Sequence, residues 1–218
     1  MDELPKKKSY LSVSSVSLLG SCETRFYDAM FKPRVVTTAM KTGIVEHTKL
    51  AEKLPKVSKE EMIASIKSGA KCSFREVSVF DRKLKLAGRM DEIRFEDGFL
   101  ENKRIGTVID DKFTKVGYSG IPLYYKLQLA SYACAVDNSD DFSSICKINR
   151  AVMICREAGT RSVLSELVAD GKEVDAWRSN VPEAVENAWA VYNKDKDAVH
   201  RRFDVTSGNW VGCYCGRV

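Results

Sequence analysis

Apolar and polar side chains alternate along Leu84–Phe95, and this period of two predicts a half-buried β-strand. Glu96-Asp97-Gly98 is a turn signal, after which Phe99–Ile105 is expected to return as the partner strand of a hairpin. The strand-like run Cys72–Phe80 comes before them. The sequence therefore predicts three strands in this region, followed by a polar loop over Gly106–Gly120.

Helical periodicity and end signals predict five helices around these strands. Ser58, followed by Glu61, resembles a capping box, Pro55 ends the helix before it, and Pro182 is expected to kink or split the last helix. The predicted elements are helices at Ser14–Phe31, Met40–Leu54, Ser58 to about Gly69, Pro122–Val136 and Glu173 to about Val199, and a further strand pair at Asn149–Arg156 and Arg161–Val168. This pattern indicates a mixed α/β fold with a central sheet flanked by helices.

The length of 218 residues allows a sizeable core but is short for two full domains, and we find no internal repeat or low-complexity tract. We therefore expect one domain over residues 1–218. Its parts would be a helical N-terminal region (about 11–70), a core with the candidate site (about 72–170) and a C-terminal helix with a cysteine-containing tail (about 172–218).

The predicted hairpin gathers charged side chains. Glu101 and Lys103 are two residues apart on one strand and so point to the same face, which Asp91 on the adjacent strand can reach if the register allows. Two carboxylates suit Mg²⁺ or Mn²⁺, and a nearby lysine can orient a metal-bound water or offset phosphate charge. The alternative is that these are solvated surface residues, because such short patterns are common.

Gln128 and Tyr132 lie one turn apart on the helix Pro122–Val136. Tyr132 could simply pack in the core. Gln128 is harder to explain that way, because it interrupts an apolar run in the middle of the helix.

Together these residues resemble a known family. Gly88-x-x-Asp91, Glu101-x-Lys103 and Gln128-x-x-x-Tyr132 are similar to the motifs of the RecB-like branch of the PD-(D/E)XK nuclease superfamily. The likeness is greatest to the CRISPR-associated Cas-four nucleases and their single-strand exonuclease relatives, some carried by archaeal viruses. Cys22-x-x-Arg25-Phe26-Tyr27, the helix with His47 and the C-terminal Cys213-x-Cys215 extend it over most of the chain.

The resemblance implies a restriction-endonuclease-like core and a DNA exonuclease that cuts single strands from the 5′ end with Mg²⁺ or Mn²⁺. It implies metal binding by His47, Asp91, Glu101 and the carbonyl of Asn102. Lys103 would act on the attacking water, while Gln128 and Tyr132 would hold the lysine or the substrate strand.

Seven cysteines without a signal peptide or a membrane-spanning apolar run favour the reducing cytoplasm, with no membrane partner. The resemblance implies that Cys22, Cys213 and Cys215 hold an iron–sulfur cluster, but the family's fourth cysteine is missing. Three cysteines with another ligand, a degenerate site or a shortened chain would each account for this. His200 is expected to be solvated, because it lies among lysines and arginines.

A net charge of +5 fits a polyanionic partner only weakly, because many unrelated proteins share it. Tyr118, Tyr124 and Tyr125, with Lys126, could bind a single strand by stacking and charge, or could pack the helix against the sheet. The acidic pair Asp110-Asp111 argues against a uniformly positive groove there.

Other functions remain open at this point. The chain could be a non-catalytic nucleic-acid-binding scaffold that keeps the fold, or an endonuclease on the same core. Protein partners would be integrases in CRISPR adaptation, or replication and recombination proteins in a viral or repair role. Related nucleases can form rings, so a homo-oligomer is a further expectation.

Overall fold

A mixed six-stranded sheet forms the framework of the computed structural model, which describes residues 8–33, 36–52, 57–100, 102–213 and 215. The strand order is β1-β3-β4-β5-β6, and β2 pairs with β3. The β1–β3 and β4–β5 pairs are parallel and the others are antiparallel. The strands are β1 (Leu11–Ser12), β2 (Cys72–Asp81), β3 (Leu86–Leu100), β4 (Lys103–Thr114), β5 (Cys146–Glu157) and β6 (Val163–Ala169).

Helices flank this sheet, as predicted. They are α1 (Val13–Val16), the 3₁₀ turn η1 (Ser17–Gly20), α2 (Glu23–Phe31), α3 (Thr38–Ala51), α4 (Lys59–Lys67), α5 (Leu123–Asp137) and α6 (Gly171–Tyr192). A separate hairpin joins β7 (Arg201–Asp204) to β8 (Asn209–Gly212). Within the described residues, no helix is both long and apolar enough to cross a bilayer. The mixed α/β prediction is confirmed.

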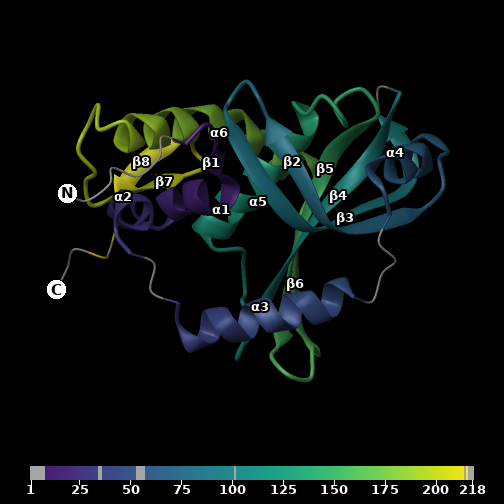
Figure 1. Ribbon diagram of the computed structural model, residues 1–218, viewed down its shortest axis with the longest axis horizontal. Helices are drawn as coiled ribbons and strands as arrows, with labels where there is room; N and C mark the ends of the chain where they lie inside the picture. The colour runs from purple at the N-terminus through teal and green to yellow at the C-terminus, as the bar shows by residue number, and fades with distance from the viewer. Residues whose placement is uncertain (1–7, 34–35, 53–56, 101, 214, 216–218) are drawn as a thin grey trace.

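The helices are distributed unevenly around the sheet (Figure 1). α1, α2, α6 and the β7–β8 hairpin are grouped at one end of the molecule, while α3 lies apart, along the bottom of the view. α5 is buried from Leu127 to Val136 and packs between the sheet and α6. α3 is fastened to the sheet by the buried Glu46, whose Oε2 lies 2.7 Å from Nε of Arg161 in the β5–β6 turn.

β4 is longer than predicted. The expected loop over Gly106–Gly120 is instead strand as far as Thr114. β4 lies between β3 and β5 and is buried from Gly106 to Asp111, where polar and apolar residues are mixed. The polar residues of β4 suggested a loop. In the structure they are paired with side chains from distant parts of the sequence, which the local pattern does not reveal.

Two helix predictions also differ from the structure. The predicted helix Ser14–Phe31 is divided into α1, η1 and α2, because Cys22 adopts an extended backbone (φ −170°) as the N-cap of α2. α6 runs through Pro182 as one element, so the expected split does not occur. The capping box at Ser58 and Glu61 is confirmed.

Glu23, the first residue of α2, joins three distant segments. Its fully buried carboxylate accepts hydrogen bonds from Asn187 Nδ2 (2.6 Å) on α6 and from the backbone N–H of Val199 (3.0 Å), and it pairs with Lys196 (2.7 Å) and Arg201 (3.2 Å). Burial alone would raise the pKa of Glu23, but the hydrogen bonds from Lys196 and Asn187 outweigh it and hold this pKa below its usual value. The charged form therefore stabilises the fold.

We expect Glu23→Gln to lower the free energy of unfolding by about 3 kcal/mol at pH 7, because it removes a buried charge and leaves the half-buried Lys196 and Arg201 without their counter-ion. The matched change Asp28→Asn, at an exposed ion pair on the same helix, should cost about 0.5 kcal/mol or less. The pKa of Glu23 is lower in the folded protein than in the unfolded chain. Ionised Glu23 therefore contributes its full stabilisation above the unfolded pKa of about 4.3, and this stabilisation is lost as the pH falls through the folded pKa. Urea unfolding at pH 7 and pH 3 measures the free energy of unfolding of both variants. If Glu23→Gln and Asp28→Asn lost the same stability at pH 7, the structural role of the Glu23 carboxylate would be contradicted.

Candidate active site

The pairing of β3 is interrupted on its β4 side. β1 pairs with Leu86 and Ala87, and β4 pairs with β3 from Glu92 onward, so in the described ladder the residues between them have no strand partner on that edge. Two side chains replace the missing bonds. Tyr132 Oη donates to the carbonyl of Arg89 (2.8 Å), and Asp91 Oδ2 accepts from the N–H of Asp111 (2.9 Å). The break therefore places the Asp91 carboxylate against β4 without leaving these backbone groups unpaired.

Asp110 and Lys112 lie beside Asp91. The β3–β4 register pairs Glu92 with Ile109, and one further step at that register would set Asp91 opposite Asp110, on the same face of the sheet. Lys112 Nζ lies 2.6 Å from Asp110 Oδ2. Gln128 on α5 holds both, because its Nε2 donates to Asp110 Oδ1 (3.1 Å) and its Oε1 accepts from Lys112 (3.4 Å). Two carboxylates, an ammonium and an amide thus meet at one point of the sheet.

The charges of this group depend on one another. Burial raises the pKa of Asp91 well above its usual value, and the neighbouring Asp110 raises it further. Burial alone would lower the pKa of Lys112, but Asp110 and Asp91 outweigh it and raise this pKa. Lys112 is therefore a cation that partly neutralises two crowded carboxylates.

His47 reaches the same point from α3. Its Nδ1 lies 3.5 Å from Asp91 Oδ2, and its ring packs edge-on against Phe113 with the centroids 5.1 Å apart. Burial lowers the pKa of His47, and the positive charge of Lys112 lowers it further. The imidazole is consequently neutral near pH 7, which is the form that binds metal ions.

A cleft of about 990 Å³ opens onto this group, with His47, Asp91, Glu76 and Arg89 among its lining residues. Glu76 interrupts the β2–β3 ladder without shifting its register, since Arg75 pairs with Glu92 and Val77 pairs with Met90. Its positive φ of 56° turns it out of the ladder, and its Oε2 lies 2.8 Å from Arg89 Nε. Asp91 therefore stands between the open cleft and the buried Asp110–Lys112 pair.

The hairpin turn does not lie where the sequence suggested. A turn at Glu96–Gly98 would place Lys103 opposite Asp91, as predicted. The structure instead has an irregularity between Phe95 and Phe99, and the strands turn at Asn102, whose φ is 62°. Leu100 pairs with Lys103 at the turn, nine positions along β3 from Asp91.

The prediction that Lys103 shares a pocket with Asp91 is therefore wrong, because the two residues lie at opposite ends of the β3–β4 pair. The carbonyl of Asn102 is at that same distant turn. Glu101 lies outside the described residues. Asp110 and Lys112 have the same spacing as Glu101 and Lys103, but they lie farther along β4, beside Asp91.

Asp111 separates Asp110 from Lys112 and points to the other face of the sheet. Its fully buried carboxylate accepts from Arg75 Nη1 (3.0 Å) on β2 and from Arg156 Nε (2.6 Å) on β5. The two neighbouring carboxylates thus lie on opposite faces of the sheet. Asp110 belongs to the candidate site, and Asp111 belongs to a structural ion network.

Gly88 makes room for the tyrosine of the Gln/Tyr helix. A Cβ at Gly88 would lie 2.6 Å from Cε1 of Tyr132 and 2.8 Å from Cγ2 of Val13. Both distances are shorter than non-bonded carbon atoms tolerate. The glycine of the Gly88-x-x-Asp91 motif therefore allows Tyr132 to approach β3 and bond the carbonyl of Arg89.

Three of the four residues predicted to bind substrate gather next to Lys112. The ring centroids of Tyr124 and Tyr125 are 3.9 Å apart, those of Tyr118 and Tyr125 are 6.5 Å apart, and Lys112 Nζ lies 4.7 Å from the Tyr125 ring. Lys126 is directed elsewhere, with its Nζ 5.3 Å from the Trp177 ring of α6. The aromatic group is half-buried, so both stacking and packing remain open to it.

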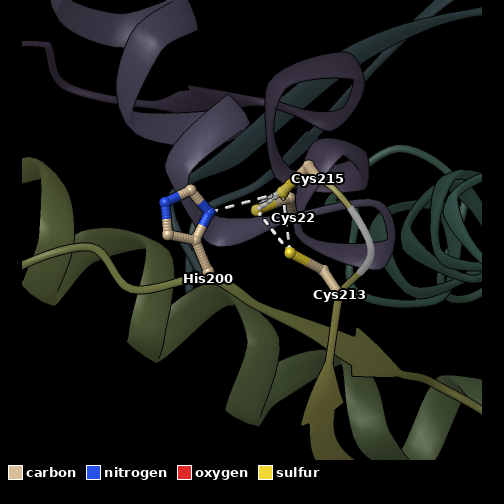
Figure 2. A group of neighbouring side chains, drawn as sticks. All are labelled: Cys22, His200, Cys213 and Cys215. Atoms are coloured by element: carbon tan, nitrogen blue, oxygen red, sulfur yellow. Dashed lines mark hydrogen bonds between the residues drawn. The ribbon is translucent and has the colours of Figure 1, made fainter. Parts of the chain in front are cut away.

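The structure brings Cys22, Cys213 and Cys215 together and adds His200 to them (Figure 2). The three sulfurs point toward one another, and the His200 ring approaches from the start of β7. His200 is exposed, as expected, but its place beside the three thiols was not predicted. Its sequence neighbours gave no signal, because its closeness to Cys213 comes from the unpredicted β7–β8 hairpin.

We expect Gly88→Ala to lower the free energy of unfolding by about 1–3 kcal/mol, because it forces the Tyr132 ring away from β3. Gly43→Ala is the matched control. A Cβ at that helical position meets nothing within 4 Å, so the change should be neutral or stabilise α3 by up to about 1 kcal/mol. Chemical denaturation of both variants tests this, and a Gly88→Ala protein as stable as Gly43→Ala would refute the close approach.

No protein-family model and no curated protein matches the chain in sequence. Solved structures are similar to it in fold. The crystal structure named "Putative exonuclease" from Eubacterium rectale is 13% identical, with a TM-score of 0.50 over 87% of this chain and 84% of the other.

Two further structures match with lower TM-scores. SSO0001 is 17% identical, with a TM-score of 0.47 over 86% of this chain and 79% of that one. An alkaline exonuclease from Laribacter hongkongensis is 8% identical, with a TM-score of 0.38 over 86% of this chain and 89% of that one. The fold assignment rests on the Eubacterium rectale structure: the chain has a restriction-endonuclease-like fold, with a central mixed sheet flanked by helices, as the family resemblance implied.

Proposed function

We propose that this protein is a divalent-metal-dependent deoxyribonuclease that hydrolyses phosphodiester bonds. The observation that carries the proposal is the convergence of His47, Asp91, Asp110, Lys112 and Gln128 at the point where β3 leaves β4. The nuclease resemblance of the Gly88-x-x-Asp91 and Gln128-x-x-x-Tyr132 motifs supports it, with Asp110 and Lys112 in the roles first expected of Glu101 and Lys103.

The donor set fits a hard divalent cation. Two carboxylates and a neutral imidazole suit Mg²⁺ or Mn²⁺, and the crowding of Asp91 against Asp110 favours a bound positive charge. His47, Asp91 and Asp110 would hold the ion beside the cleft. When bound, it would polarise a phosphoryl oxygen and lower the pKa of a coordinated water.

Lys112 would act chiefly as a fixed positive charge. Asp110 and Asp91 raise its pKa, so Lys112 is a cation near neutral pH. It can stabilise the negative charge that develops on the phosphate and on the attacking oxygen. Its position is fixed by Asp110 and by the Oε1 atom of Gln128.

Gln128 and Tyr132 are positioning residues. Gln128 hydrogen-bonds both members of the Asp110–Lys112 pair, and Tyr132 holds the β3 backbone two residues before Asp91. They therefore fix the two strands relative to each other. This support keeps the reacting groups in a constant geometry.

We further propose that the substrate is single-stranded DNA, cut from the 5′ end. The aromatic group of Tyr118, Tyr124 and Tyr125 beside Lys112 supports a single strand, because exposed bases can stack on aromatic rings. Polarity, and an association with CRISPR integrases or with replication and recombination proteins, rest on the resemblance alone. So does assembly into a homo-oligomer.

We expect Lys112→Ala and Asp110→Asn each to reduce metal-dependent cleavage of end-labelled single strands by about 10²–10⁴-fold. Lys103→Ala is the matched control and should cleave like the unmodified protein, since Lys103 lies at the distant hairpin turn. Reactions with Mg²⁺, Mn²⁺ or EDTA establish the metal requirement. Loss of activity in Lys103→Ala with full activity in Lys112→Ala would reverse the assignment.

Exonuclease action predicts that linear single strands are degraded while closed circular ones persist. A strand labelled at its 5′ end should release the label in its smallest products first, and a blocked 5′ end should slow the reaction. Opening of the circle would identify an endonuclease instead. Binding without cleavage of any substrate in either metal would identify a non-catalytic scaffold and refute the nuclease proposal.

A further inference from the structure

Three thiols and one imidazole converge where α2 meets the β7–β8 hairpin (Figure 2). Cys22 Sγ lies 3.1 Å from Cys213 Sγ and 2.7 Å from Cys215 Sγ, and those two are 2.7 Å apart. His200 Nδ1 lies 3.5 Å from Cys215 Sγ, and all four ligand atoms lie within 4.8 Å of one another. We propose that these four residues bind a single tetrahedral metal ion, and that this ion is zinc.

The spacing of the sulfurs argues for one ion. Around tetrahedral zinc, with Zn–S bonds of about 2.3 Å, neighbouring sulfurs lie about 3.8 Å apart. Small movements of the side chains, of about 1 Å, would bring the three sulfurs from their present separations to that distance. In a four-iron cluster each thiolate binds a different iron, so the sulfurs must stand much farther apart. The geometry therefore does not fit a four-iron cluster, and the gathering of all four ligand atoms about one point favours a single ion.

The ligand set also fits zinc. Three cysteines and one histidine are a common structural zinc set, and they fill all four tetrahedral positions. His200 supplies the ligand that a fourth cysteine would otherwise provide. With no position left open for water or substrate, the ion would stabilise the fold and take no part in catalysis.

The surrounding backbone holds the ligands in place. The β7–β8 register pairs Arg201 with Gly212, so His200 and Cys213 face each other at the next position, where the N–H of Cys213 donates to the carbonyl of His200 (3.5 Å). Cys22 is the extended N-cap of α2. The residue after it, Glu23, binds the segments on both sides of His200, through the N–H of Val199 and the side chain of Arg201.

A zinc ion here would cross-link segments that are 191 residues apart in the sequence, at Cys22 and Cys213. Binding free energy at such a site stabilises the folded state, because the unfolded chain has no preformed site. We therefore expect metal removal to loosen α2 from the β7–β8 hairpin and to lower the melting temperature.

The test begins with full-length protein purified without oxygen and without added metal, and then washed with EDTA to clear weakly held ions. Metal analysis should give one zinc per chain, with no stoichiometric iron or acid-labile sulfide. Cys213→Ser and His200→Ala should lose the zinc. Cys72→Ser, a cysteine outside the group, should keep it.

Asp91→Ala separates this proposal from the nuclease proposal, because it should keep its zinc whether or not the unmodified protein cuts DNA. Should the ligand variants fail to fold, Co²⁺ can replace zinc in the unmodified protein. Tetrahedral cobalt with thiolate ligands gives strong visible absorption bands, and titration should end at one cobalt per chain.

Two results would overturn the proposal. Brown protein with stoichiometric iron and acid-labile sulfide would show that the cysteines hold a cluster. Metal-free protein that has two fewer free thiols after denaturation would show a disulfide in place of an ion.

Discussion

The candidate site depends on one hydrogen bond, from the N–H of Asp111 to the carboxylate of Asp91 (2.9 Å). Where β3 leaves β4, a backbone donor would otherwise be buried without a partner, at a cost of about 1–3 kcal/mol. The Asp91 side chain satisfies that donor and is thereby held near enough to Asp110 for the two charges to interact. The same break exposes the carbonyl of Arg89 to Tyr132, which ties α5 to β3. A local defect in the sheet thus gathers the charged groups.

The two candidate metal sites differ in the type of ligand and in whether a coordination position is left open. His47, Asp91 and Asp110 offer an imidazole and two oxygen ligands next to an open cleft, which suits a weakly held ion that must accept substrate. Cys22, His200, Cys213 and Cys215 form a closed set of soft ligands. α5 connects the two regions. Tyr124 lines a second pocket of about 460 Å³ together with Arg25 and Cys215, while its neighbour Tyr125 lies under Lys112.

The sequence predicted the elements better than their register. Short-range signals, such as the capping box at Ser58 and the apolar run of α5, identified helices correctly. Asp91, Gln128, Tyr132 and His47 were found through motif resemblance, and the structure brings them together. Asp110 and Lys112 were missed because the turn was expected at Gly98, and such a shift exchanges the partner of every residue in a hairpin. His200 was missed because the β7–β8 hairpin, which brings it beside Cys213, was not predicted.

A crystal soaked in Mn²⁺ offers the most direct test of the central claim, because anomalous scattering locates the ion without reference to activity. We predict a peak about 2.2 Å from carboxylate oxygens of Asp91 and Asp110 and from a ring nitrogen of His47. The amine of Lys112 should lie close by without binding the ion. A peak at the hairpin turn near Lys103, or none near Asp91, would contradict the account.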